Sequence, residues 1–215
     1  SERSRGLGDV YKRQMLMGAT DTIIAGRASS ADLAGLAVGT AFATTIWMFF
    51  SGVIFSVTPI VAQLYGAKKY IEIGQKIREI LWIALFLGIL IFLMFMNMGL
   101  ILKFFPIDTN ITEISVDYLK AVAIGATFIT IFTCLRCYSE GMTLTKPVFY
   151  IAFVGMLINI PLDLMFVYGY LGAPKLGGVG CGIATSIVNF LMMVTMFIYI
   201  ASVSYTHLTL PTNVA

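Results

Sequence analysis

The chain has 215 residues, of which 59% are hydrophobic and only 12% are charged, with a mean hydropathy of +0.91. Soluble domains carry about 25% charged residues, so this composition excludes a cytosolic enzyme, a disordered protein and a nucleic-acid-binding protein. The net charge of +3 forms no basic patch, and the chain is predicted to be an all-α integral membrane protein with several spans.

Both ends of the chain carry the same short DNA signature, in opposite orientations. Residues 9–14 back-translate to the mosaic end of a transposase used in sequencing libraries, and residues 203–207 to its reverse complement. We therefore interpret 1–14 and 202–215 as translated sequencing adapter and exclude them from the fold. The only histidine, His207, is excluded with them, so no Ser-His-Asp triad, Cys-His dyad or HExxH zinc site is expected in 15–201. The natural protein is expected to continue beyond both ends of this segment.

The retained segment reads as six apolar spans joined by short connections. A helix needs about 20 apolar residues to cross a bilayer, and the first span is cut short by the adapter. The predicted spans are 15–27, 33–64, 80–102, 114–142, 147–169 and 178–201. Ser29 and Asp32 are suited to cap the start of the second span. No connection is long or polar enough to mark a second domain.

Basic residues in the connections predict how the bundle is oriented. The connection at 64–79 carries four of them, Lys68, Lys69, Lys76 and Arg78. Connections on the opposite side mix basic with acidic residues. The positive-inside rule therefore predicts a cytoplasmic location for 64–79 and for the N-terminal end of the first span.

Asp21 lies inside the apolar stretch 15–26. An aspartate at membrane depth costs a few kcal/mol, which favours a functional role such as binding a proton or a cation in a cavity. The alternative is that Asp21 lies near the end of a truncated helix, reaches the interface and has no function.

Asn159 and Asp163 stand four residues apart with Pro161 between them. On a helix this spacing puts both side chains on one face, and the proline removes a backbone hydrogen bond and introduces a kink. A small polar site follows from this arrangement. The alternative is an interhelical clamp that only holds the bundle together.

Three other features are interpreted as structural. Arg136 and Glu140 have the spacing of an ion pair near the cytoplasmic interface. Cys134 and Cys137 form a CxxC without a second pair or a histidine, so neither zinc binding nor redox chemistry is supported. The glycines of GGVGCG at 177–182 open a span and are expected to allow close helix approach.

Several motifs together resemble one transporter family. They are TDTIIAG at 20–26, VTPIVAQLYGA at 57–67, EGMTLTKP at 140–147, INIPLD at 158–163 and GAPKLGGVGCG at 172–182. These segments resemble the multidrug and toxic compound extrusion (MATE) transporters, NorM branch, and the likeness covers nearly all of 15–201. The segment is accordingly identified as the N-terminal six-span lobe of a twelve-helix transporter.

The resemblance implies a function and a set of site residues. Such transporters are secondary active antiporters that export cationic amphipathic drugs or toxins in exchange for H⁺ or Na⁺ by alternating access. Asp21 matches the first-span aspartate of the family, and Asn159 and Asp163 match an Asn and an Asp of the fifth span. A hydroxyl of the sixth span is expected from Thr185 or Ser186, with Thr185 taken as the candidate.

The same resemblance fixes the expected partners and location. No cofactor is expected beyond the transported H⁺ or Na⁺, and the partners are small cationic substrates, the lipid bilayer and the missing C-terminal lobe. The expected location is the bacterial cytoplasmic (inner) membrane, with multiple spans. An alternative is a lipid-linked oligosaccharide flippase of the same superfamily, which usually lines its cavity with basic residues. A membrane enzyme is disfavoured because no nucleophile–base pair is found.

Overall fold

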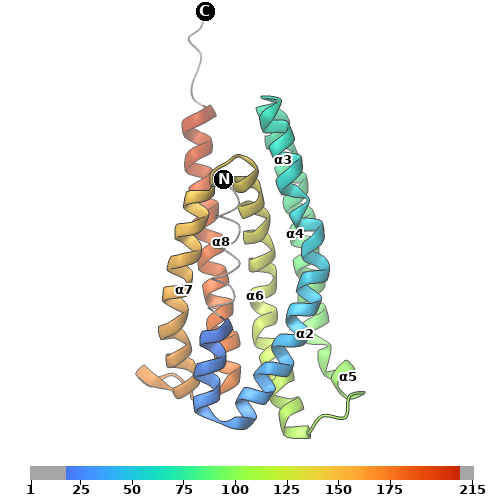
Figure 1. Ribbon diagram of the computed structural model, residues 1–215, viewed down its shortest axis with the longest axis vertical. Coiled ribbons are helices and arrows are strands. Elements are labelled where there is room, and N and C mark those ends of the chain that lie inside the picture. The colour runs from blue at the N-terminus through green and yellow to red at the C-terminus, as the bar shows by residue number, and fades with distance from the viewer. Residues whose placement is uncertain (1–17, 209–215) are drawn as a thin grey trace, which may run out of the picture.

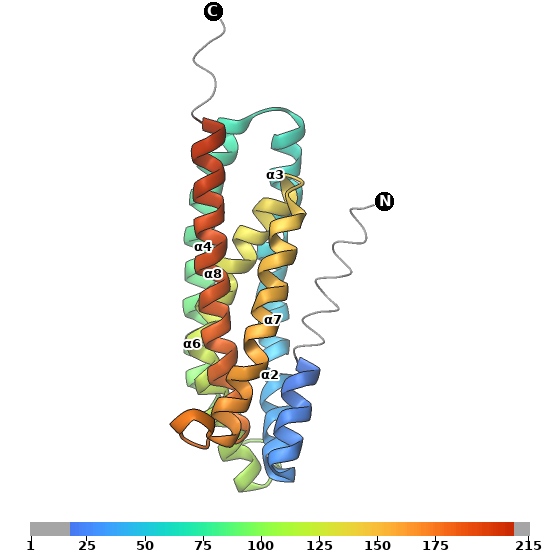
Figure 2. The same ribbon diagram turned by 90° about the vertical axis from the view of Figure 1, so that its left-hand side faces the viewer.

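The computed structural model describes residues 18–208, with side chains described for 18–202. Regular structure in this range is helical, and five helices are long and apolar enough to cross a membrane, namely Ser30–Gly66, Tyr70–Met96, Thr109–Gly141, Thr145–Tyr168 and Gly178–Ser202. A helical segment at 18–28 precedes them, beside α2 (Figure 2). The helices run up and down in one bundle (Figure 1), so the predicted all-α membrane fold is confirmed. Residues 15–17 of the first predicted span, and 1–14 and 209–215 of the proposed adapter, lie outside the described residues.

The predicted span 33–64 is confirmed as a span, but it is not one helix. It forms α2 (Ser30–Phe55) and α3 (Val57–Gly66). Pro59 has no N–H to donate to the carbonyl of Phe55, four residues earlier, and the chain turns at Ser56 between the two helices. The break thus lies where the proline removes a backbone hydrogen bond.

The next predicted span, 80–102, starts too late and misses a break. The observed helices are α4 (Tyr70–Met96) and α5 (Met98–Leu102). The added turns of α4 carry exposed ion pairs such as Lys76–Glu79, at 2.7 Å. Charged side chains are costly in lipid but not in a helix, so counting apolar residues found the membrane-buried part of α4 and not its start.

The remaining helices agree with prediction, apart from an earlier start of the first and a later end of the last. They are α6 (Thr109–Gly141), α7 (Thr145–Tyr168), the short 3-10 helix η1 (Tyr170–Gly172) and α8 (Gly178–Leu208). Asp108 caps α6 by accepting a 2.9 Å hydrogen bond from the amide of Asn110. Gly169, with φ of +78°, ends α7 in the left-handed conformation.

The helix α6 forms the centre of the bundle (Figure 1). It packs against α2, α3, α4, α5, α7 and α8, most extensively against α8, α4 and α2. Its residues Leu119 and Ala123 are fully buried and join the largest apolar cluster, together with Ile91 of α4 and Cys181 of α8. The other helices therefore share one common partner.

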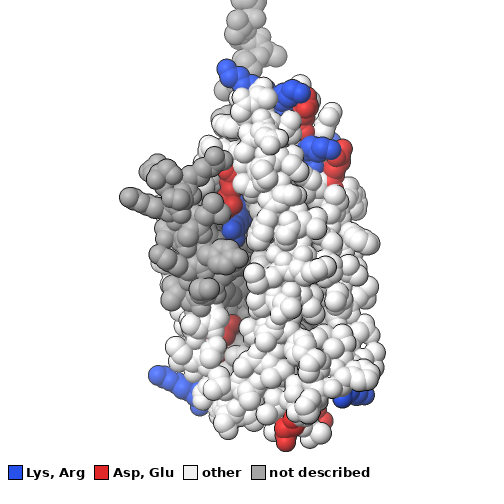
Figure 3. Space-filling model, turned by 45° about the vertical axis from the view of Figure 1, so that its right-hand side comes forward, with Lys and Arg blue, Asp and Glu red and all other residues white. Residues whose placement is uncertain are grey.

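The two ends of the bundle differ. At the basic end lie the connections 67–69 and 142–144, and at the far end lie 29 and 169–177. Figure 3 shows that, on the face it displays, charged side chains gather toward these two ends, apart from a few atoms beside the grey residues. The broad uncharged surface between them suits the acyl chains of a bilayer.

At the far end, Asp32 links the start of α2 to the start of α8. Its amide donates to Ser29 Oγ at 2.9 Å, which confirms the predicted cap of α2, and Ser29 Oγ donates back to Asp32 Oδ2 at 2.6 Å. The other carboxylate oxygen accepts a 2.8 Å hydrogen bond from the amide of Gly178, the first residue of α8. A Cβ at Gly177 would collide with this carboxylate, so the glycine there is needed for the close approach.

Candidate functional site

The structure brings Asp21, Asn159 and Asp163 together inside the bundle. Asn159 Nδ2 lies 3.1 Å from Asp21 Oδ1 and 3.0 Å from Asp163 Oδ2, with the amide oriented so that its nitrogen, not its oxygen, faces the two acceptors. Asn159 and Asp163 are fully buried, and Asp21 is 8% exposed. One amide group therefore bridges two buried carboxyl groups on different helices.

Two helices supply these side chains. Asp21 comes from the segment 18–28, whereas Asn159 and Asp163 occupy one face of α7, as the four-residue spacing predicts. Because the same nitrogen of Asn159 lies 3.1 Å from one carboxyl group and 3.0 Å from the other, the two carboxyl groups are close neighbours. Two bare carboxylates so close together repel in a low-dielectric site, and a shared proton or cation removes that repulsion.

Two buried oxygen atoms, one of Asp163 and one on α8, have no hydrogen-bond partner among the described residues. Asp163 Oδ1 and Thr185 Oγ1 hydrogen-bond to no group in the part of the chain that the structure describes. Thr185 stands four residues after Cys181 on α8, and the Cys181 thiol lies 3.8 Å from the carbonyl oxygen of Asp21. Thr185 is therefore on the face of α8 that turns toward the first helix.

The neighbouring candidate, Ser186, is already engaged in packing. Its hydroxyl donates to the carbonyl of Ala121 at 2.7 Å and accepts from the amide of Gly125 at 3.1 Å. These bonds fasten α8 to α6. Of the two hydroxyls considered from the sequence, that of Thr185 has no partner within the described residues 18–202, whereas that of Ser186 has two.

The helix α7 continues through Pro161 from Thr145 to Tyr168. The proline ring has no N–H for the carbonyl of Leu157, which leaves that carbonyl without its usual helical donor. The predicted kink and the assigned roles of Asp21, Asn159, Asp163 and Thr185 remain predictions.

Sequence reasoning missed Tyr118 of α6. This tyrosine is buried on the central helix. The hydroxyl of Thr40, on α2, lies 3.4 Å from the hydroxyl of Tyr118. A tyrosine within an apolar span looks like any core aromatic residue, so the sequence carries no signal for this placement.

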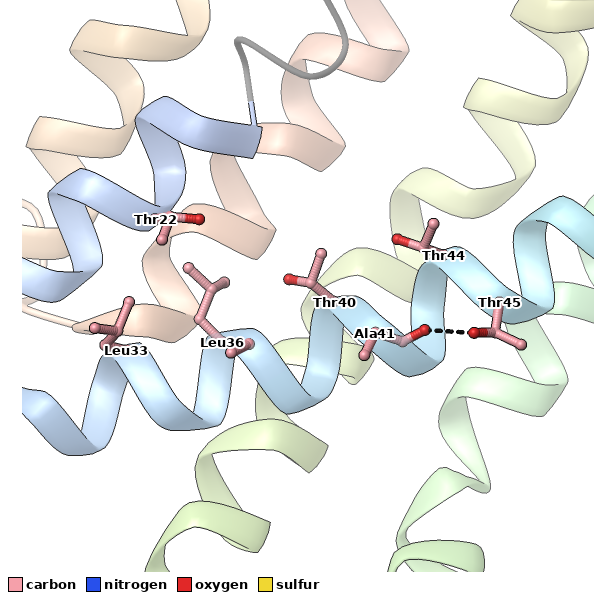
Figure 4. Close-up of a pocket in the computed structure, with 8 residues that line it drawn as sticks. Thr22, Leu33, Leu36, Thr40, Ala41, Thr44 and Thr45 are labelled. Carbon is pink, nitrogen blue, oxygen red and sulfur yellow. Dashed lines mark hydrogen bonds between the residues drawn. The ribbon is translucent and has the colours of Figure 1, made fainter.

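A pocket of about 430 Å³ lies between the first helix and α2 (Figure 4). Its lining is Thr22, Leu33, Leu36, Ala37, Thr40, Ala41, Thr44 and Thr45, from the first helix and α2. Thr22 directly follows Asp21, so the pocket borders the segment that carries the first carboxylate. Methyl and hydroxyl groups line it, which suits an amphipathic molecule with a large apolar surface.

The predicted ion pair of Arg136 and Glu140 is confirmed, and its predicted location near the cytoplasmic interface stays a prediction. Arg136 Nε lies 2.8 Å from Glu140 Oε1, and the two side chains are only 5% and 10% exposed. Their helix is the central one, and its last turns pack so closely on α3 that a Cβ at Gly141 would lie 2.7 Å from Val61 Cβ. Neighbouring helices therefore cover the pair near the end of α6.

The predicted structural role of the glycines before and within α8 agrees with the packing. A Cβ at Gly180 would lie 2.6 Å from the carbonyl carbon of Phe166 and 2.8 Å from the amide nitrogen of Val167. Both are backbone atoms of α7, so α7 and α8 touch along their main chains here. Cys134, Cys137 and Cys181 are buried free thiols, in keeping with their predicted role as packing residues.

Comparisons with known proteins give the same fold and identify the family. A family model described as MatE matches residues 13–165. The MATE transporter NorM-NG, solved with R6G and a monobody, is 29% identical with a TM-score of 0.69, covering 91% of this chain and 43% of that one. A MOP superfamily transporter from Pyrococcus furiosus is 18% identical with a TM-score of 0.81, covering 92% and 43%. The eukaryotic MATE transporter AtDTX14 is 16% identical with a TM-score of 0.78, covering 93% and 46%.

The chain thus spans less than half the length of these solved structures. Its size and its bundle of spans fit a single lobe, the N-terminal one, of such a transporter. The chain belongs to the MatE family of membrane transporters.

Proposed function

We propose that the chain is the N-terminal lobe of a secondary active antiporter that exports cationic amphipathic drugs or toxins in exchange for H⁺ or Na⁺. The proposed site consists of Asp21, Asn159, Asp163 and Thr185. The observation that carries the proposal is the bridge from Asn159 to two buried carboxyl groups, at 3.1 and 3.0 Å.

Burial makes this site suitable for a small cation. Two carboxyl groups out of water are costly unless a proton or a metal ion offsets their charge. Asp163 Oδ1 and Thr185 Oγ1 are buried with free lone pairs, and hard cations such as Na⁺ prefer oxygen ligands. A proton shared by the two carboxyl groups satisfies the same electrostatic demand.

Export of the substrate is coupled to uptake of the ion because the cationic substrate and H⁺ or Na⁺ compete for the same carboxylates. A cationic substrate is attracted to the lobe while the carboxylates are charged, and uptake of H⁺ or Na⁺ removes that attraction. The pocket of about 430 Å³ between the first helix and α2, lined in part by Thr22, gives the apolar part of the substrate a surface on the helix that carries Asp21. Alternating access of the two lobes then releases the substrate on one side of the membrane and the ion on the other.

The other elements of the proposal follow from the family. The proposed partner is a C-terminal lobe of the same polypeptide, and the coverage of only 43% of the NorM-NG structure by this chain supports it. The cytoplasmic membrane of a bacterium is the proposed location. The structure of NorM-NG holds R6G, which supports a small organic substrate here.

The flippase alternative is not favoured. A pyrophosphate group needs basic partners, whereas Asp21 and Asp163 are acidic. Arg136 is buried, but its Nε already bonds to Glu140. The charges at the site therefore repel an anionic lipid carrier.

The experiment uses the complete transporter, whose coding sequence is recovered by sequencing genomic DNA outward from both ends of 15–201. The purified protein is reconstituted in liposomes, and export of a fluorescent cation is followed under an imposed H⁺ or Na⁺ gradient. Asp21→Asn and Asp163→Asn are expected to abolish gradient-driven export.

Asp117→Asn is the matched control, because Asp117 is an exposed aspartate on α6 that pairs with Lys120 at 3.0 Å. This variant is expected to export normally. Full export with full ion dependence in both Asp21→Asn and Asp163→Asn would overturn the proposal.

A further inference from the structure

At the far end of the bundle, a series of hydrogen bonds connects the first helix, α7, the connection after α7 and the start of α8. The Tyr168 hydroxyl, at the last residue of α7, donates to the carbonyl of Ile24 at 3.0 Å. The chain after α7 turns back on the same helix, where the amide of Gly177 donates to the carbonyl of Val167 at 3.3 Å. Gly178 then donates to Asp32, as described above, which completes the path to the end of the segment 18–28.

In this series of hydrogen bonds, the side chain of Tyr168 bonds directly to the first helix. Ile24 follows Asp21 by three residues, a distance of about 4.5 Å along the helix axis. An α-helix is stiff over one turn, so fixing the Ile24 carbonyl also fixes the height of Asp21. A slip by one residue moves Asp21 by about 1.5 Å and rotates it by about 100°. Either change breaks its 3.1 Å contact with Asn159.

The backbone around Tyr168, at the end of α7, is fixed by a helix cap and by a hydrogen bond. Gly169 ends α7 with φ of +78°, and the amide of Leu176 donates to the carbonyl of Phe166 at 2.9 Å. The ring of Tyr168 also packs against the largest apolar cluster, which includes Ile24. The hydroxyl therefore acts from a fixed position.

We propose that Tyr168 is a positioning residue for the ion site, holding the first helix in the register at which Asp21 meets Asn159. The inference rests on the proposed function, because it assigns Tyr168 a role in that same site. Tyr168 bonds to the backbone of the first helix and acts on the ion only through Asp21.

The test is Tyr168→Phe in the complete transporter, which removes one oxygen atom and keeps the packed ring. Losing one hydrogen bond is expected to raise the concentration of coupling ion needed for half-maximal export about twofold to tenfold. The maximal export rate at saturating ion is expected to stay close to that of the wild type. Tyr170→Phe is the matched control, because Tyr170 is 60% exposed and carries the same chemical change.

A double-mutant cycle separates positioning from general stability. Binding of the same ion to purified protein is measured for Tyr168→Phe, Asp21→Asn and the double variant. If Tyr168 acts through Asp21, its substitution has no further effect once Asp21 is changed. An equal loss in both backgrounds, or an ion dependence of Tyr168→Phe identical to that of the wild type, would overturn the proposal.

Failure of the proposed function gives a different result. In that case the wild-type transporter itself shows no ion-coupled export, and the ion binds neither to it nor to Asp21→Asn. An ion-coupled wild type with an unaffected Tyr168→Phe variant refutes the positioning role alone.

Discussion

Replacing Asp32 by alanine removes the carboxylate that links the start of α2 to the start of α8. The substitution deletes the 2.8 Å hydrogen bond from Gly178 and the 2.6 Å bond from Ser29 Oγ. It leaves the first amide of α8 without its partner and removes negative charge from a helix N-terminus. The cap of α2 persists in part, because Ser29 Oγ still accepts from the amide of residue 32.

The expected cost is the sum of two effects. A hydrogen bond to a charged group contributes about 1.5–3 kcal/mol, and a negative charge at a helix N-terminus contributes about 0.3–1 kcal/mol. Asp32→Ala is therefore expected to lower the free energy of unfolding by about 2–4 kcal/mol. For a unit of this size that corresponds to a fall in Tm of roughly 4–15 °C. Asp32→Asn retains an acceptor for Gly178 and is expected to lose about half as much.

Three buried free thiols provide the assay. Cys134, Cys137 and Cys181 are shielded in the folded lobe, so a thiol-reactive fluorophore reports unfolding when the complete transporter is heated in detergent. Asp117→Ala is the control, because it breaks an exposed ion pair worth less than about 1 kcal/mol. A Tm for Asp32→Ala within one degree of the Asp117→Ala value would refute the reasoning.

Three further predictions use the same thermal assay. Thr185→Val removes a hydroxyl without a partner among the described residues, so we expect an unchanged Tm and weaker ion dependence of export; an unchanged ion titration would exclude Thr185 from the site. Gly180→Ala forces a Cβ against the backbone of α7 and is expected to cost at least about 1–3 kcal/mol, whereas Gly52→Ala, which meets no atom within 4 Å, is not expected to destabilise. Arg136→Met leaves Glu140 buried and unpaired, which is expected to lower the free energy of unfolding by about 3–5 kcal/mol. Adding Glu140→Met is expected to restore most of that stability. Additive losses in the double variant would contradict this.

Much of the bundle could be predicted from the sequence, because lipid imposes a simple length rule. The first residue of α8, Gly178, was predicted correctly, since a cluster of glycines and a proline marks the preceding connection. The break at Ser56 could not be predicted from Pro59 alone. A proline ends some membrane helices and lies within others. Pro161 shows the second outcome within the same chain.

The candidate site was only partly accessible to sequence reasoning. The spacing of Asn159 and Asp163 fixes their shared face, since helical geometry is local. Their meeting with Asp21 depends on tertiary packing across about 140 residues of chain, and only the family resemblance linked the three. The contact of Tyr168 with a backbone carbonyl left no trace in the sequence, because any residue type supplies that carbonyl.

The central position of α6 has a consequence for how the lobe is made. The helices α2, α3 and α4 touch one another sparingly and touch α6 extensively, yet all three are synthesised before it. Association of membrane helices depends on such packing rather than on burial from water. Until residues 109–141 are inserted, the early spans therefore lack the helix against which they pack most extensively. A chain that ends before Thr109 leaves these spans without that partner, whereas insertion of residues 109–141 supplies it to all three.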